Sequence, residues 1–177
     1  ELARKCGFDN INTDLIAGLP TDTPESFKNS LDSIVRLNAE CITVHTLCMK
    51  RASRLTTEGV TLDLQQARDA REMLAYTQNI LGQNEYIPYY MYRQSRMVGN
   101  LENVGWSKRG FESLYNVYVM DETHTILACG SGGVTKLKRN NPDYLERIFN
   151  FKYPYEYIDR FDELIQRKSG IMQFYGQ

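Results

Sequence analysis

Residues 11–20 read Ile-Asn-Thr-Asp-Leu-Ile-Ala-Gly-Leu-Pro and residues 41–47 read Cys-Ile-Thr-Val-His-Thr-Leu, and these two stretches decide the fold. Each predicts a strand, and the first strand has a polar interruption and ends at Gly-Leu-Pro. Between them, Thr23-Pro24-Glu25 predicts a helix start with Thr23 as the N-cap. The strand–helix–strand order indicates a βαβ crossover, so the two strands are expected to be parallel neighbours.

The composition excludes several classes of protein. The 177 residues are 42% hydrophobic and 24% charged, which is the balance of an ordinary globular chain. A net charge of −1 gives no strong electrostatic drive toward nucleic acid, so we expect no nucleic-acid partner. The apolar runs are far shorter than the roughly 18 residues of a membrane helix, so we expect no membrane span.

The cysteines and the first residues indicate the compartment and the completeness of the chain. The four cysteines show no C-x-x-C spacing, and the chain is neither short nor dense in cysteine. This pattern predicts reduced thiols in a cytoplasmic protein rather than a disulfide framework. The chain begins with Glu1 and runs at once into an apparent helix end, which favours a piece of a longer protein.

The remainder of the chain is expected to mix helices and strands, so the fold class is α/β. Asp63 predicts the cap of a helix over residues 64–83, and Pro88 makes residues 86–92 an edge or irregular strand. The other expected elements are a mostly irregular segment over 93–112, a hairpin from 114–120 and 124–129, a helix starting at Asn141-Pro142, and a last helix over 154–168 ended by Gly170.

Asp14 is the first candidate for a functional residue, because it interrupts an apolar strand of the βαβ unit. A buried carboxylate is unfavourable unless it is paired or hydrogen-bonded. One interpretation is that Asp14 faces outward or bonds locally. The other is a ligand contact near the carboxyl end of the strand, where α/β sheets bind ligands, and a carboxylate there suits ribose hydroxyls.

Several further features allow both a structural and a functional interpretation. The glycine-rich run 130–133 is either a tight turn or a place where backbone amides approach a ligand. The basic loop 50–54 is either a solvated loop or a contact for an acidic substrate. The same two interpretations apply to four other cations, Arg93, Arg96, Lys108 and Arg109.

The aromatic and histidine residues are also ambiguous. The tyrosines at positions 86, 89, 90 and 92 form either edge-strand packing or a flat platform for a large ring system. His45 and His124 are more typical of structural histidines, and no catalytic triad can be argued from their spacing.

Three segments, in order along the chain, carry a resemblance to a known family. The first is residues 11–20 followed by 23–27, and the other two read Asn-Val-Gly-Trp-Ser-Lys-Arg-Gly-Phe-Glu-Ser-Leu-Tyr-Asn (103–116) and Leu-Ala-Cys-Gly-Ser-Gly-Gly-Val (127–134). They resemble segments of the oxygen-independent coproporphyrinogen III oxidase family, the last two its NFAKPG-E-RHN and LGxGAxA stretches. These are radical S-adenosylmethionine (SAM) enzymes. Residues 92–94 and 97–105 resemble its coproporphyrinogen dehydrogenase-like branch.

This resemblance implies a domain organisation. Residues 1–62 would be the later part of a partial (β/α) radical SAM barrel, and residues 63–177 would be a mixed α+β C-terminal region. The family's CxxxCxxC motif, which holds a [4Fe-4S] cluster through three thiolates, does not occur in this sequence. The resemblance therefore places the cluster ligands upstream of Glu1.

Four positions match cofactor contacts of the family. Asp14 matches the acidic residue that contacts the SAM ribose, and Ile16 is implied to pack on the adenine. Cys48 matches a small residue whose backbone contacts the adenine. Val134 matches an apolar residue near the SAM site.

One departure from the family concerns the substrate. The Arg-His-Asn of the family stands here as Leu114-Tyr115-Asn116, so its basic pair is lost. A cationic group suits propionate carboxylates, and Arg93, Arg96 or Lys108 would have to substitute. No catalytic residue is assigned.

The resemblance implies an oxidoreductase of haem biosynthesis. The full protein would cleave SAM reductively to a 5′-deoxyadenosyl radical, which takes hydrogen from two propionates of coproporphyrinogen III. Loss of carbon dioxide and an electron would leave the vinyl groups of protoporphyrinogen IX, and an electron donor for SAM cleavage would be a further partner. The isolated chain is expected to be inactive. The alternatives are a haem-binding haem chaperone, or another radical SAM protein without decarboxylase activity, acting on a different porphyrin-type substrate or none.

Overall fold

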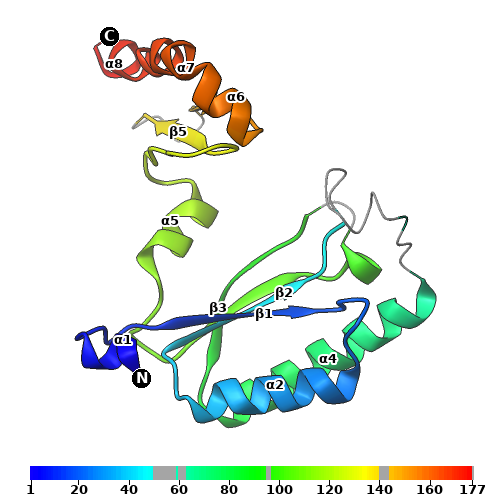
Figure 1. Cartoon of the computed structure of the whole chain (residues 1–177). Coiled ribbons are helices and arrows are strands. Elements are labelled where there is room, and N and C mark those ends of the chain that lie inside the picture. Colours follow the sequence, from blue (N-terminus) through cyan, green and yellow to red (C-terminus); the bar gives the residue numbers. More distant parts are fainter. Residues whose placement is uncertain (50–58, 60–62, 95–96, 140–143, 177) are drawn as a thin grey trace. The chain divides into compact units, whose positions relative to one another are not determined.

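The computed structural model covers the 177 residues and describes residues 1–49, 59, 63–94, 97–139 and 144–176. The chain forms two compact units, Glu1–Ser113 and Leu114–Gln177, coloured along the sequence in Figure 1. The boundary expected between residues 62 and 63 falls inside the first unit, and the division into domains at that point stays a prediction. The basic loop 50–54 lies outside the described residues.

The first unit is built on the predicted βαβ crossover. Strands β1 (Asn12–Ala17) and β2 (Cys41–Thr46) are parallel neighbours, as the sequence indicates. Helix α2 (Pro24–Arg36) joins them and begins at Thr23, whose hydroxyl accepts a hydrogen bond from the Ser26 amide while the Ser26 hydroxyl accepts one from the Thr23 amide. This reciprocal cap satisfies two backbone donors of the first turn and fixes where the helix starts.

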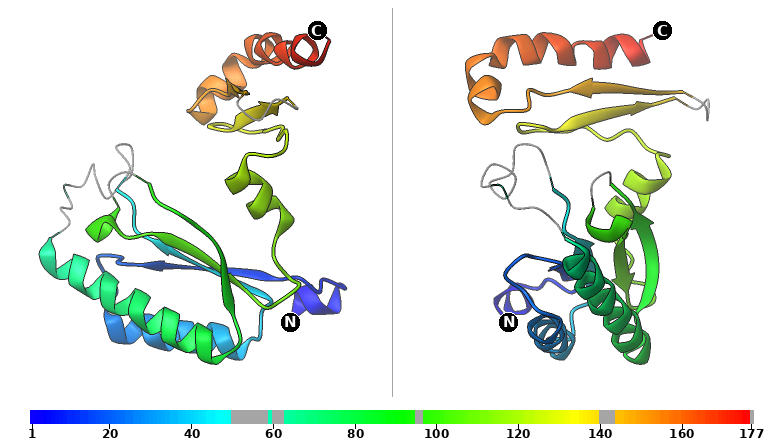
Figure 2. Two further views of the ribbon diagram at one scale, coloured as in Figure 1. Left: turned by 180° about the vertical axis from the view of Figure 1, so that it is seen from behind. Right: turned by 90° about the vertical axis from the view of Figure 1, so that its right-hand side faces the viewer.

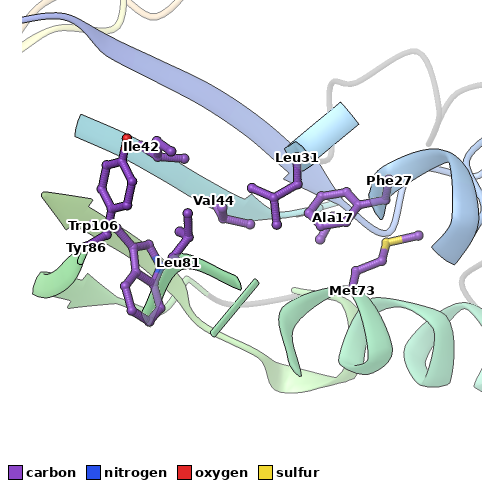
Figure 3. Close-up of a cluster of buried hydrophobic side chains, with 9 residues drawn as sticks. All are labelled: Ala17, Phe27, Leu31, Ile42, Val44, Met73, Leu81, Tyr86 and Trp106. Atoms are coloured by element: carbon purple, nitrogen blue, oxygen red, sulfur yellow. The ribbon is translucent and has the colours of Figure 1, made fainter. Parts of the chain in front are cut away.

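Two helices cover one face of the sheet and form the core of the unit with it. Helix α4 (Leu64–Gln83) begins at Asp63, whose carboxylate accepts from the Gln66 amide at 2.8 Å. The views in Figures 1 and 2 show α2 and α4 on the same side of the sheet. The buried side chains between the helices and the sheet are Ala17, Phe27, Leu31, Ile42, Val44, Met73, Leu81, Tyr86 and Trp106 (Figure 3). Each fully buried large apolar side chain contributes about 1.5–3 kcal/mol, so this layer stabilises the packing of the two helices on the sheet.

The sheet has four strands in the order β1-β2-β4-β3, and one of them lies where an irregular segment was expected. Strand β4 (Asn103–Ser107) pairs antiparallel with β2 on one side and with β3 (Ile87–Tyr92) on the other. The expectation over residues 93–112 is therefore wrong for 103–107. Glycine and polar residues interrupt the apolar alternation that would mark β4 as a strand in the sequence. The strand forms because β2 and β3 pair with its two edges. Strand β3 is an edge strand, as Pro88 predicts.

Two short helical segments flank the sheet. Helix α1 (Leu2–Lys5) is tied to the sheet by Arg4, which donates to the Glu40 carboxylate at 2.8 Å, and the same carboxylate accepts from the Ile11 amide at 3.0 Å. Burial works to raise the pKa of Glu40, but these two donors outweigh it and hold the pKa below its usual value. The 3₁₀ helix η1 (Val98–Asn100) lies against α4.

The second unit differs most from the expected elements. Residues 114–120, expected as a strand, belong to helix α5 (Leu114–Asp121), and residues 124–129 make one bridge, between Ile126 and Lys136, rather than a strand. The hairpin of this unit is formed instead by β5 (Val134–Lys138) and β6 (Leu145–Phe149). The helix expected from Asn141-Pro142 is therefore wrong over 145–149, and residues 140–143 lie outside the described part. Short apolar runs of this kind cannot be assigned to helix or strand by periodicity alone.

The last part of the chain is helical but is divided differently from the expectation. The helix expected over 154–168 is two helices, α6 (Pro154–Asp159) and α7 (Phe161–Lys168), separated at Arg160, whose φ of −113° and ψ of 32° are not helical. The Arg160 guanidinium lies 4.1 Å from the centre of the Phe151 ring and binds Glu163. Gly170 does not end the helical region, because it begins α8 (Gly170–Tyr175).

The described residues contain no metal-ligand cluster, no membrane-spanning helix and no disulfide. They contain no group of three or more His, Cys, Asp or Glu side chains that could hold a metal ion. Within the described ranges, no helix is both long enough and apolar enough to cross a membrane. None of the four cysteines, all of which lie in described segments, forms a disulfide.

The core predicts a large effect of truncating Phe27, which is 1% exposed between α2 and the sheet. Phe27→Ala should lower the free energy of unfolding by about 3–5 kcal/mol, because it removes transfer energy and leaves a cavity. Chemical unfolding followed by the fluorescence of Trp106, the single tryptophan, reports on this unit. Phe8→Ala is the matched control, since Phe8 is 63% exposed and should change stability little. Equal losses for the two variants would contradict the assignment of the core.

Candidate functional site

The face of the sheet opposite the helices carries polar and aromatic side chains from all four strands. Side chains alternate along a strand, so Asp14 and Ile16 share this face while Leu15 and Ala17 belong to the core side. Residues paired across neighbouring strands share a face as well. We call this surface the open face. It includes Asn12, Asp14, Ile16, Thr43, His45, Tyr90, Tyr92 and Gly105.

Asp14 is exposed on the open face rather than buried. Its side chain is 58% exposed, so the desolvation penalty that first drew attention to it does not arise. One carboxylate oxygen, Oδ1, accepts a hydrogen bond from Asn12 Nδ2 at 2.7 Å. The other, Oδ2, lies 3.9 Å from His45 Nε2. Asp14 therefore faces outward and bonds locally, and its carboxylate is also accessible to a ligand.

A second set of contacts on the open face runs from Asn12 across β2 to β3. Thr43 donates to Asn12 Oδ1 at 3.1 Å, and the Thr43 and Tyr90 hydroxyl oxygens lie 3.3 Å apart. Tyr90 reaches Thr43 because its ring lies over Gly105, where an added Cβ would come within 1.8 Å of a ring carbon. Burial raises the pKa of Tyr90, so its hydroxyl keeps its proton at neutral pH.

The orientation of Tyr90 depends on an irregularity in β3. The pairing between β3 and β4 shifts register between Pro88 and Tyr90, so Tyr89 is an additional residue in the strand. If residues 88–92 alternated regularly, without this irregularity, Tyr90 would lie on the same face as Pro88, which lines the helix side. With it, Tyr90 and Tyr92 both lie on the open face, with ring centres 6.3 Å apart and planes 8° from parallel.

His45 is held from its other side by Tyr92. The Tyr92 hydroxyl lies 3.4 Å from His45 Nδ1, while Nε2 faces Asp14. Burial is the main cause that raises the pKa of Tyr92, so this hydroxyl is also protonated at neutral pH. The sequence interpretation of His45 as a structural histidine overlooked both contacts. The available signal was the two-residue spacing that puts Thr43 and His45 on the face of Asp14.

The parallel strands β1 and β2 end at the same edge of the sheet. The ladder continues past β2, where the Leu47 amide donates to Ala17 O at 2.9 Å. Cys48 is the next residue, and its backbone forms an isolated antiparallel β-bridge with Met97. Two of the four expected cofactor contacts, Ile16 and Cys48, therefore lie toward the carboxyl end of this strand pair, and a third, Asp14, lies nearer the middle of β1 on the same face as Ile16.

A glycine permits the close packing at this edge. Gly18 follows β1 with a φ of +84°, a conformation that side chains rarely adopt. An added Cβ would also lie 3.2 Å from the Cβ of Ala70 on α4. The turn after β1 and the approach of α4 both depend on this glycine.

Val134 and the glycine-rich run belong to the second unit. Val134 begins β5, and its expected role near SAM stays a prediction. Three amides of the run have partners within the unit: Gly130 donates to the Tyr157 hydroxyl, Gly132 to Phe151 O, and Gly133 to Gly130 O. The contacts favour the interpretation of this run as a tight turn.

The cations considered as substrate contacts have differing surroundings. The Arg93 guanidinium binds Glu102 at the surface, and Lys108 binds the Asn38 side chain. Arg96 lies outside the described residues. In the second unit, His124 stacks on Tyr118 with ring centres 3.8 Å apart, as expected for a structural histidine.

The first unit is an α/β unit in which two parallel strands end at one edge of the sheet, the place where α/β proteins commonly bind ligands. In comparisons with known proteins, the chain is 37% identical over 172 residues to the oxygen-independent coproporphyrinogen-III oxidase-like protein HemZ of Bacillus subtilis, covering 97% of this chain and 34% of that protein. It is 29% identical over 150 residues to the haem chaperone HemW of Lactococcus lactis, covering 80% of this chain and 35% of that protein. No protein-family model matches the chain.

A solved structure shows the same fold. Coproporphyrinogen III oxidase (HemN) of Escherichia coli, described as a radical SAM enzyme, matches with a TM-score of 0.58 and 20% identity, over 91% of this chain and 36% of that one. The chain is therefore a homologue of the oxygen-independent coproporphyrinogen oxidase-like proteins and has the fold of part of a radical SAM protein, which confirms the resemblance and the fold class. It spans about a third of the length of these relatives.

The contact between Gly105 and Tyr90 predicts strong coupling between these positions. Gly105→Ala should lower the free energy of unfolding by about 1–3 kcal/mol, because the Tyr90 ring must leave its place. In a Tyr90→Ser background the same substitution should have much less effect. Unfolding of the four proteins of this cycle, followed by Trp106 fluorescence, measures the coupling. Additive effects would show that the ring does not rest on Gly105.

The buried thiol of Cys41 predicts slow alkylation. Cys41 is 1% exposed and donates to Phe111 O at 3.0 Å, and burial raises its pKa. The thiolate is the nucleophile, so Cys41 should react with iodoacetamide at pH 8 far more slowly than the exposed Cys6 and Cys129. The folded chain holds this proton more tightly than the unfolded chain, so the associated stability is complete below the ordinary thiol pKa and is lost as pH rises above it. Peptide mapping after timed labelling measures the rates, and equal rates at the three thiols would refute the prediction.

Proposed function

We propose that this chain is part of a cytoplasmic radical SAM oxidoreductase of the coproporphyrinogen dehydrogenase type, and that its open face holds the nucleoside of SAM. One observation carries the proposal. In a homologue 37% identical to a coproporphyrinogen oxidase-like protein, an accessible carboxylate, Asp14, shares a face of two parallel strands with the exposed apolar side chain of Ile16, which lies toward their carboxyl end.

The residues of the open face fit a ribonucleoside. Each carboxylate oxygen of Asp14 has at most one close neighbour among the contacts described, so acceptor capacity remains for ribose hydroxyls. Ile16 is 43% exposed, which leaves an apolar surface for the flat face of a purine. In this proposal the backbone at Cys48 bounds the adenine.

The iron–sulfur cluster would be bound elsewhere in the longer protein. A [4Fe-4S] cluster of this kind needs three neighbouring thiolates, and the described residues contain no group of three potential ligands. When SAM and the reduced cluster are bound, they supply the hydrogen-abstracting species for oxidative decarboxylation of the propionates of coproporphyrinogen III. The part of this chain is to bind and orient the nucleoside, while an electron donor and the rest of the barrel complete the enzyme.

The second candidate function is haem binding without decarboxylation, which is favoured by the similarity to the haem chaperone HemW. The two functions separate in the full-length protein. Conversion of coproporphyrinogen III to protoporphyrinogen IX under reducing, anaerobic conditions supports the dehydrogenase. Stable haem loading together with no decarboxylation supports the chaperone.

Removing the Asp14 carboxylate should weaken SAM binding. In the full-length protein, Asp14→Ala should lower the affinity for S-adenosylhomocysteine about 10- to 100-fold, the effect of losing hydrogen bonds to a charged acceptor. Isothermal titration calorimetry measures the affinity. Asp162→Ala, at an exposed site of α7, is the control and should bind like the unchanged protein. Unaltered affinity in Asp14→Ala would remove Asp14 from the site.

A further inference from the structure

The two oxygens of the Asp14 carboxylate are held by different strands. Asn12, two residues earlier on β1, donates to Oδ1 at 2.7 Å. His45, opposite Ile16 on β2, places Nε2 3.9 Å from Oδ2. A lone aspartate on an exposed strand can turn about its side-chain bonds, and these two contacts restrict that rotation.

The Asn12 side chain, which makes the first of these contacts, is itself fixed in orientation. The Thr43 hydroxyl donates to Asn12 Oδ1, which identifies the oxygen of the amide and directs its NH₂ group at Asp14. Thr43 is 2% exposed and its oxygen lies 3.3 Å from the Tyr90 hydroxyl. An exposed asparagine is therefore oriented from beneath by a buried threonine.

The His45 ring, which makes the second contact, is oriented in a similar way. The two ring nitrogens of a neutral histidine differ, and the partner of one decides which of them carries the proton. The Tyr92 hydroxyl faces Nδ1 at 3.4 Å, and burial keeps that hydroxyl protonated. In the tautomer in which this hydroxyl donates to Nδ1, the ring proton lies on Nε2 and the imidazole N–H faces Asp14. At 3.9 Å this is an electrostatic contact rather than a direct hydrogen bond.

We propose that Asn12 and His45 are positioning residues that clamp the Asp14 carboxylate, so that its two oxygens accept from both hydroxyls of a vicinal diol. The clamp rests on the proposed function, because it assumes that Asp14 binds the nucleoside. It adds a specificity: the site distinguishes a ribose from a sugar without the 2′ and 3′ hydroxyls. Neither Asn12 nor His45 contacts the ligand in this proposal, since each acts through Asp14.

The test compares two probes in the full-length protein, S-adenosylhomocysteine and its 2′,3′-dideoxy analogue. Asn12→Ala and His45→Phe should each weaken binding of S-adenosylhomocysteine about 3- to 10-fold, the loss expected when a misoriented Asp14 carboxylate forfeits about one hydrogen bond to the ribose. Both should leave the affinity for the dideoxy analogue unchanged. His45→Gln keeps a donor that can reach Asp14 and should recover most of the loss.

Matched controls separate the clamp from general damage. His124→Phe changes the other histidine, which stacks on Tyr118 in the second unit, and Asn79→Ala changes an exposed asparagine of α4. Both should bind the two probes like the unchanged protein. Asn12 is exposed, so Asn12→Ala is expected to fold normally and keeps the test decisive if His45→Phe is unstable.

The outcomes distinguish the clamp from the proposed function. If the unchanged protein does not bind S-adenosylhomocysteine, both are wrong. If Asp14→Ala loses affinity but Asn12→Ala does not, the site stands and the clamp is wrong. Equal losses for the two probes would also overturn the clamp, because they would show a role in packing rather than in presenting Asp14 to a diol.

Discussion

The arrangement of the first unit depends on the fact that helices α2 and α4 cover only one face of its sheet. Helices α2 and α4 take the apolar side chains of β1, β2 and β4 on that face, and this packing fixes the plane of the sheet. The alternation of a strand then determines which residues remain for the other face. Asp14 is available to a ligand because Leu15 and Ala17, on either side of Ile16, are held in or against the core.

The parts of the fold that were predictable are those with a strong local signal. Thr23 and Asp63 mark the starts of α2 and α4, since each satisfies backbone donors that would otherwise lack partners. The parallel pairing of β1 and β2 follows from the length of the crossover between them. Asp14 also gives a local signal, because its carboxylate interrupts the apolar pattern of its strand.

The parts that could not be predicted are decided by tertiary contacts. Strand β4 has glycine at position 105 and polar residues at its ends, so its sequence lacks a strand pattern, yet β2 and β3 pair with both of its edges. The network around Asp14 is likewise non-local, because Asn12, Thr43 and Tyr90 meet only after all four strands are assembled. In the second unit, the apolar run 114–120 suits either structure, and the helix is formed.

The additional residue in β3 makes the effect of a deletion depend on where in the strand it falls. Tyr89 has no partner in β4, so its loss would leave Tyr90 opposite Gly105 and Met91 opposite Val104, and both would keep their surfaces. Loss of Met91 would instead move Tyr90 or Tyr92 to the opposite surface, and Thr43 or His45 would lose its phenolic partner. Among homologues, a gap of one position at Tyr89 is therefore compatible with retention of Thr43 and His45, and an alignment that places this gap elsewhere in β3 would pair residues from opposite surfaces.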